Sequence, residues 1–325
     1  RQLRVWVQPR PDRLLHAHAC ATKLRERGQS GAPSSTFRQG SASAAVGRMK
    51  RFTEQIARGE RFEFGANWAR FLTVVNDERI AAAKESLEKM LGADSLRGKT
   101  FLDIGSGSGL FSLAARLLGA AVHSFDYDPQ SVACTEELKR KYLPDDTSWT
   151  IEQGSVLDQE YLSRLGAFDV VYAWGVLHHT GAMWAAMGNV VPLVKPGGRL
   201  FIAIYNDQGR ASVRWRHIKK IYCSAPKILR GLILCVAFVR LWGSTILRDF
   251  LRGEPGASWR NYGTGSGRGM SLWRDLVDWV GGYPFEVARP EEVFDFYRER
   301  GFRLERLKTC GGGLGCNEFL FKKED

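Results

Sequence analysis

The stretch FLDIGSGSGLF, residues 101–111, joins an apolar run to a glycine-rich turn, and LFSLAARLLG continues to residue 119 with helical spacing. A strand, a glycine turn and a helix in this order bring backbone N–H groups and a helix N-terminus to one place, where a ligand can bind. The glycines are spaced GxGxG. Dinucleotide-binding loops read GxGxxG, and nucleoside-triphosphate loops need a Lys followed by Ser or Thr, so the spacing disfavours both.

Two carboxylates accompany this loop. Asp103 lies two residues before Gly105, where its charge would repel a pyrophosphate but suits the ammonium of an amino acid. Asp126 ends the next predicted strand, 21 residues after Gly105, where a carboxylate can bind both hydroxyls of a ribose. The loop and the two carboxylates therefore favour a ligand such as S-adenosylmethionine over NAD, FAD or a nucleoside triphosphate.

Strands and helices alternate along the chain around this loop. Strands are predicted at residues 99–105, 121–128, 147–156, 168–177 and 198–206, and helices at 110–119, 130–143 and 183–194. This alternation predicts an α/β protein with a doubly wound, mostly parallel sheet. A further helix at 290–302 and two strands at 303–310 and 316–323 predict a C-terminal antiparallel hairpin that completes a seven-stranded sheet.

The chain divides into five predicted segments, and its net charge of +12 is unevenly spread. Residues 1–61 carry +9 and residues 206–260 carry +8, so the remainder is slightly acidic. The predicted segments are a disordered or non-native arm at 1–44, a helical lid at 45–95, a cofactor-binding core at 96–206, a basic helical insertion at 207–289 that includes a loop at 261–271, and a core-completing end at 290–325.

Five motifs carry a family resemblance: FLDIGSGSG (101–109), SFDYD (124–128), EQGSVLD (152–158), FDVVYAWGVLHH (168–179) and LVKPGGRLFIAIY (193–205). In this order they resemble the motifs of class I S-adenosylmethionine-dependent methyltransferases, most closely the small-molecule O-methyltransferases of ubiquinone biosynthesis. The resemblance covers residues 96–205. It implies a Rossmann-like sheet with N-terminal helices, S-adenosylmethionine as the cofactor and methyl transfer as the activity.

The same resemblance implies roles for residues of the core. Asp103 and Gly105 would contact the methionine moiety, and Asp126 would hold the ribose. The other implied contacts are Gly107 and Gly109 at the close approach of the cofactor, Ser155 and Val156 beside the adenine, Tyr127 stacked on the adenine edge, and Trp174 near the cofactor or in the core.

Residues on the acceptor side are predicted from three other places. His178 and His179 follow the fourth strand, so one of them is a candidate general base, or they cap the next helix and shape the pocket. Two adjacent His disfavour a metal site, and no metal is predicted. Asn67 and Trp68 precede the long helix and would face the acceptor or form a hydrophobic staple. Asn317, beside the last turn, is a third substrate candidate.

The basic insertion mixes apolar, aromatic and cationic residues over 213–252, and Pro226 divides it. Three interpretations remain open: an amphipathic segment on an anionic membrane that offers a lipid-like acceptor, a lid with a solvated charged face, or a nucleic-acid surface. Arg230 and Arg240 argue against a membrane-spanning helix. The run LILCVAFV at 232–239 is too apolar for a nucleic-acid face.

The leading hypothesis is a cytoplasmic methyltransferase that modifies a small or lipid-like acceptor at oxygen, with a peripheral membrane contact through 213–252 as an open possibility. Six scattered Cys indicate free thiols in a reducing compartment, and Arg and Pro near the start disfavour a secretory signal. The alternatives are an RNA methyltransferase and a non-catalytic protein that binds the cofactor or a membrane. The oligomeric state is not predicted.

Overall fold

The computed structural model describes residues 47, 49–260 and 272–325. The arm predicted at 1–44 and the loop predicted at 261–271 lie outside the described residues. A seven-stranded sheet forms the centre, in the order β3-β2-β1-β4-β5-β7-β6. The strands are β1 (Thr100–Ile104), β2 (Ala121–Asp126), β3 (Trp149–Gln153), β4 (Phe168–Trp174), β5 (Val194–Tyr205), β6 (Phe302–Lys308) and β7 (Cys316–Lys323).

The pairing confirms the predicted sheet. Strands β1 to β5 pair in parallel, whereas β7 is antiparallel to both β5 and β6. Residues 101–104 of β1 are all buried, because helices cover both faces of a doubly wound sheet and leave its central strands no solvent side. The predicted C-terminal hairpin is therefore also confirmed.

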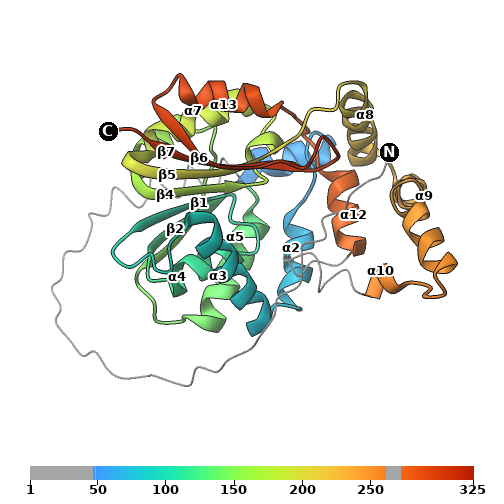
Figure 1. Cartoon of the computed structure of the whole chain (residues 1–325), viewed down its shortest axis with the longest axis horizontal. Coiled ribbons are helices and arrows are strands. Elements are labelled where there is room, and N and C mark those ends of the chain that lie inside the picture. The colour runs from blue at the N-terminus through green and yellow to red at the C-terminus, as the bar shows by residue number, and fades with distance from the viewer. Residues whose placement is uncertain (1–46, 48, 261–271) are drawn as a thin grey trace.

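Two helical layers enclose the sheet (Figure 1). One face carries α3 (Asp77–Leu91), α4 (Leu110–Leu117) and α5 (Pro129–Tyr142), and the other carries α7 (Met183–Val190) and α13 (Pro290–Arg298). A short helix, α6 (Gln159–Ser163), and two 3₁₀ turns, Leu177–His179 and Val191–Leu193, complete the core. Helix α3 begins where the Asn76 side chain accepts a hydrogen bond from the Arg79 N–H and ends at the left-handed Gly92.

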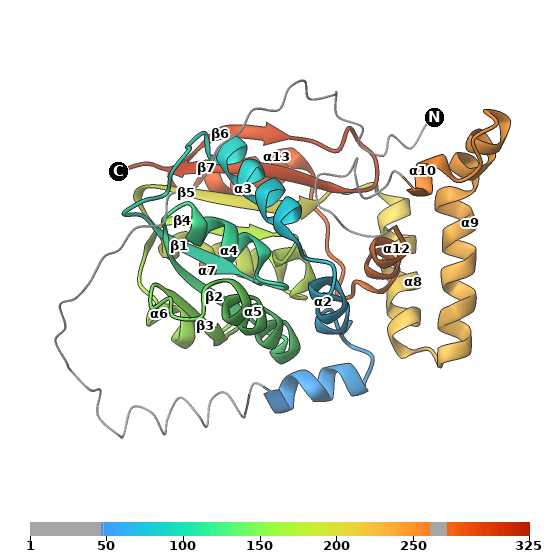
Figure 2. The same cartoon turned by 90° about the horizontal axis from the view of Figure 1, so that it is seen from below.

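The insertion after β5 is helical and lies beside the sheet. It contains α8 (Arg210–Ser224), α9 (Lys227–Leu251), α10 (Ala257–Arg260) and α12 (Leu272–Gly281). Figure 2 shows α8 and α9 side by side, with α12 against α8. Pro226 caps α9, because proline fits the start of a helix but breaks its interior. The three long helices share a small core of their own that includes Tyr222, Leu234 and Val280.

Helical residues 49–57 and α2 (Gly65–Leu72) lie at the end of the sheet where the parallel strands terminate (Figure 2). The Gly65 N–H donates to Asp128 Oδ2 at 2.7 Å. The other oxygen of Asp128 accepts the Gln130 N–H at 2.9 Å and caps α5. One carboxylate therefore joins the N-terminal helices to the core.

Candidate active site

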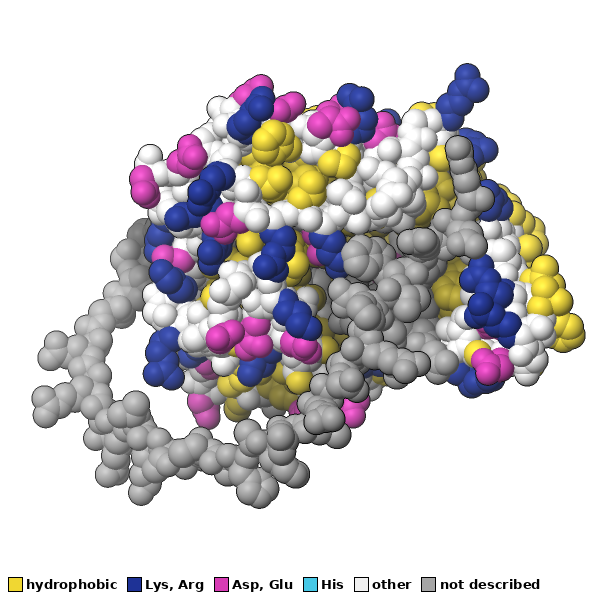
Figure 3. All heavy atoms as spheres, in the orientation of Figure 1, with side chains coloured by type: hydrophobic (Ala, Val, Ile, Leu, Met, Phe, Trp, Pro, Cys, Tyr) yellow, Lys and Arg dark blue, Asp and Glu magenta, His cyan; other side chains and the backbone are white. Residues whose placement is uncertain are grey.

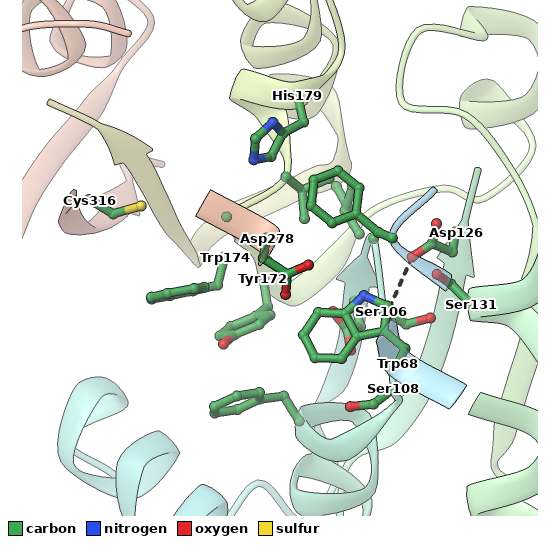
Figure 4. A pocket seen from close by; sticks show the side chains of 18 of the residues that line it. Trp68, Ser106, Ser108, Asp126, Ser131, Tyr172, Trp174, His179, Asp278 and Cys316 are labelled. Atoms are coloured by element: carbon green, nitrogen blue, oxygen red, sulfur yellow. Dashed lines mark hydrogen bonds between the residues drawn. The ribbon is translucent and has the colours of Figure 1, made fainter. Parts of the chain in front are cut away.

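A cavity of about 2260 Å³ lies at the carboxyl ends of the parallel strands. Its walls come from the loops after β1 to β4, from α2 and α12, and from the beginning of β7. Side chains from these distant segments point toward one space in Figure 4, among them Trp68, Tyr172, Trp174 and Asp278. This is where ligands bind in doubly wound proteins.

The glycine loop forms one wall of the cavity and has no room for side chains at Gly105 and Gly107. Gly107 has a φ of 56°, and a Cβ there would lie 2.9 Å from the Trp68 indole. A Cβ on Gly105 would lie 2.5 Å from Val176. Gly109 does not line the cavity and instead starts α4 with a φ of 77°. The first two glycines thus let the backbone itself form the surface.

Asp126 fixes the shape of this loop from the end of β2. Its Oδ2 accepts the Gly107 N–H at 2.9 Å, the dashed line in Figure 4, and its Oδ1 accepts the Asp128 N–H at 2.9 Å. Each carboxylate oxygen has two lone pairs, so both oxygens can accept a further bond from a ligand hydroxyl. Burial raises the pKa of Asp126 to about 7.

Asp103 lies beneath the loop at the end of a hydrogen-bond chain. The Trp149 indole N–H donates to Ser124 at 2.8 Å, Ser124 and Ser112 are 2.7 Å apart, and the Ser112 hydroxyl donates to Asp103. Burial raises the pKa of Asp103 to about 7, and only 2% of the residue is exposed. Asp103 also lines the cavity.

Arg61 is a cavity residue that the sequence did not predict. It precedes α2, donates to the His179 carbonyl at 2.9 Å, and places its guanidinium 5.0 Å from the centre of the Tyr127 ring. Burial lowers its pKa, while the charges of Asp126 and Asp128 oppose this shift. No motif marks Arg61, because its partners Tyr127 and His179 in the cavity lie far along the chain.

The residues expected near the adenine and the cofactor lie around the same cavity. Tyr127, Ser155, Val156 and Trp174 all line it. The Tyr127 ring also meets the edge of Phe52, from helical residues 49–57, at 5.5 Å between ring centres. The N-terminal helices thus approach the predicted adenine position.

The two candidate bases differ in position. His178 is fully buried outside the cavity wall, with its ring 4.0 Å from that of Tyr205. His179 lines the cavity, and its Nδ1 lies 2.7 Å from the Pro284 carbonyl, so Nδ1 carries the proton and donates it there. Burial lowers the pKa of His179 to about 3 and that of His178 well below its usual value. Both imidazoles are therefore neutral near pH 7 and poor proton acceptors.

We accordingly expect His179→Asn, whose amide can still donate to Pro284, to keep turnover within about tenfold of the native value. The pH profile between 6 and 8 should not change, because an imidazole with a pKa of about 3 does not titrate there. Initial rates over this pH range, with the acceptor identified as described below, measure both quantities. A loss of about a thousandfold together with a lost inflection near pH 6.5 would return the general-base role to His179.

The three substrate candidates also differ in position. Trp68 lines the cavity over the glycine loop. Asn67 is buried and its amide donates to Asp278. Asn317 is buried outside the wall, where it donates to Asn206 at 3.0 Å and accepts the Cys310 N–H at 3.1 Å. Asn67 and Asn317 therefore hold α12 and the hairpin in place, while Asp278 and Cys316 line the cavity.

Asp278 is a second cavity residue missed from the sequence. With Leu272, Asp275 and Leu276 it forms the face of α12 that lines the cavity. The sequence does contain one indication of this face. Asp275 and Asp278 are three residues apart in LWRDLVDWV, and this spacing puts both carboxylates on one side of a helix. Since such pairs are usually solvated, the spacing alone does not indicate a site.

Known proteins resemble the part of the chain that builds the glycine loop. Residues 102–200 match the model of a family described as a methyltransferase domain. A ribosomal protein L11 methyltransferase of Methylococcus capsulatus is 45% identical over 151 residues, which are 46% of this chain and 48% of that protein. A ubiquinone biosynthesis O-methyltransferase of Pseudomonas paraeruginosa is 34% identical over 118 residues, 36% of this chain and 48% of its own length.

The chain spans about half the length of these curated relatives. Among solved structures, the magnesium protoporphyrin IX methyltransferase of Synechocystis with bound S-adenosylhomocysteine aligns over 83% of this chain and 100% of that one, at 15% identity and a TM-score of 0.48.

The strand order, the glycine loop and the matched domain define a class I methyltransferase fold. Residues 102–200 are similar to methyltransferase domains, in agreement with the motifs.

Proposed function

We propose that this chain transfers a methyl group from S-adenosylmethionine to an oxygen atom of a small or lipid-like acceptor. One observation carries the proposal: a single cavity joins the glycine loop and Asp126 to a wall of aromatic and apolar side chains. A methyltransferase needs both parts in one enclosed space, because the donor and the acceptor must be held in line at near-attack distance.

The donor half of the cavity fits S-adenosylmethionine. Asp126, at the ribose position, has acceptor capacity left on both oxygens. Asp103 offers a carboxylate to an ammonium group, and Gly105 and Gly107 leave the backbone bare. When bound there, S-adenosylmethionine supplies an electrophilic methyl group on a sulfonium.

The acceptor half combines aromatic and apolar side chains with the carboxylates of Asp275 and Asp278. Its wall includes Phe64, Trp68, Tyr172, Trp174, Leu272 and Leu276. Such a wall excludes water and favours a bulky, weakly polar acceptor over a highly charged one. The rings also limit how the acceptor can turn, which helps to align its oxygen with the methyl group.

Asp278 is the residue that we assign to the acceptor's proton. Its side chain points into the cavity beside Tyr172 and Trp174 (Figure 4). The buried Asn67 amide donates to one of its oxygens. A carboxylate fixed in this way can accept a hydroxyl proton as the oxygen attacks the methyl group. Neutral His179, whose ring lies near the same end of α12, can offer only a hydrogen bond.

Methyl-labelled S-adenosylmethionine tests the proposal when it is incubated with the purified protein and a cell extract. The label is then divided among lipids, small aqueous molecules, RNA and protein. We expect it in the lipid or small-molecule fraction, and the Asp278→Asn variant should transfer at least about a hundredfold less. Label in RNA or in protein would replace the proposed acceptor class, and binding without transfer to any fraction would contradict an enzymatic role.

A further inference from the structure

We propose that the outward face of α8 and α9 docks on an anionic membrane surface, with α9 lying flat on the bilayer. The docking rests on this surface alone. Its consequence, that a hydrophobic acceptor reaches the cavity from the bilayer, rests on the proposed function.

Helix α9 exposes an apolar stripe along its whole length. Ile228 is 83% exposed, Val236 71% and Phe250 70%. Leu232, Val239 and Leu247 extend the stripe, since residues three, four or seven to eight apart share one face of a helix. Figure 3 shows apolar side chains along this edge of the molecule. A stripe this long is unusual for a surface helix, whose outward side is normally polar.

The opposite side of α9 is packed on the protein. Leu234 and Ala237 are buried in the cluster that also contains Leu276 and Val280 of α12. Among the described helices, α9 is the one long and apolar enough to cross a membrane, so the charge argument from Arg230 and Arg240 was too strict. Because one side is packed on α8 and α12, however, lipid cannot surround the helix in this fold. Contact with one leaflet suits it better than crossing.

The charge of the surface selects the partner. In α8 and α9, every residue of which is described, the exposed ionised side chains are all Lys or Arg: Arg210, Arg214, Arg216, Lys220, Lys227, Arg240 and Arg248. The one acidic residue of these helices, Asp249, is buried and accepts two hydrogen bonds from Ser258.

An apolar stripe beside cations matches an anionic bilayer, where the stripe enters the acyl boundary and the cations meet headgroups. A symmetric dimer through the same face would instead bring cations against cations, since each copy presents the same patch. The charge therefore favours the bilayer over a second copy of the chain.

The same helix connects the surface to the cavity. Leu241 and Trp242 of α9 line the cavity, so the helix presents one side to the acceptor space and another to the exterior. A membrane docked on α9 would therefore lie next to the acceptor half of the site. This arrangement suits an acceptor that resides in the bilayer.

Flotation of the full chain with vesicles tests the docking. We expect binding to phosphatidylcholine vesicles containing about 30% phosphatidylglycerol, with weaker binding to neutral vesicles and in high salt. The double variant Val236→Glu, Phe250→Glu should bind at least about tenfold more weakly, because it places two carboxylates in the stripe. Leu117→Glu, at a 45% exposed site on α4, is the matched control and should bind as the native chain does.

Three outcomes would overturn the docking. The first is a double variant that binds the anionic vesicles as well as the native chain does. The second is membrane-bound protein that alkaline carbonate does not extract, as expected of a crossing helix, and the third is a native dimer that binds no vesicles and becomes monomeric in the double variant. Binding of S-adenosylmethionine is measured on the same samples. A native chain that does not bind S-adenosylmethionine would contradict the proposed function, while the vesicle result would still stand.

Discussion

Asp126→Ala is expected to weaken S-adenosylmethionine binding by about 1.5–3 kcal/mol, roughly ten- to 150-fold. The variant loses the predicted bonds to the ribose. It also leaves the N–H groups of Gly107 and Asp128 without their acceptor, so the glycine loop loses its shape as well as its ligand contact. Removing the carboxylate also takes a neighbouring negative charge from the buried Arg61, and this makes the folded loop region less stable.

Calorimetric titration with S-adenosylmethionine measures this change directly. Asp126→Asn should lie between the native chain and the Ala variant, because its amide oxygen can accept one of the two N–H groups but carries no charge. Asp145→Ala, at an exposed carboxylate between α5 and β3, is the matched control and should bind normally. Equal affinity of Asp126→Ala and the control would remove Asp126 from the cofactor site.

Asp103→Asn is expected to stabilise the ligand-free protein above pH 7 while it weakens cofactor binding. The folded protein holds the pKa of Asp103 at about 7, against 3.8 for the solvent-exposed group of the unfolded chain. Between these values the folded state binds more protons than the unfolded state, so the contribution of Asp103 to stability falls as pH rises and is fully lost above about pH 7. Three units correspond to about 4 kcal/mol, an upper limit.

Urea unfolding of the ligand-free proteins from pH 4 to 8 tests this expectation. The advantage of Asp103→Asn should grow with pH up to about 7 and then remain constant, because the amide does not ionise and its oxygen still accepts from Ser112. Ser108→Ala, elsewhere in the loop, is a control for simple disturbance of this region. A variant that is less stable than the native chain by the same amount at every pH would show that Asp103 is not a strained carboxylate.

The parts of the fold that follow from local sequence were predicted correctly. The glycine turn, the βα alternation and the hairpin turn each depend on residues close together in the chain. The ends of helix α3 are also set by local residues, the Asn76 cap and the left-handed Gly92. Boundaries differ by a few residues: β5 begins at Val194 instead of 198, because its pairing with β4 starts there across a bulge.

The acceptor side could not be predicted in the same way, since it depends on contacts between distant segments. Arg61 meets His179 across 118 residues, and Asn67 meets Asp278 across 211. Burial is a further property that spacing does not give. It makes His179 a neutral hydrogen-bonding group, although an adjacent pair of His after the fourth strand suggested a base.

The cavity is built from two separable stretches of chain. Its donor half, with the glycine loop and Asp126, lies within residues 102–200, whereas α2, α12 and the Cys316 end of β7 supply much of the remaining wall from outside that range. Similarity confined to residues 102–200 therefore bears on the donor half of the cavity, whereas α2, α12 and the start of β7 lie outside the matched range and complete the wall.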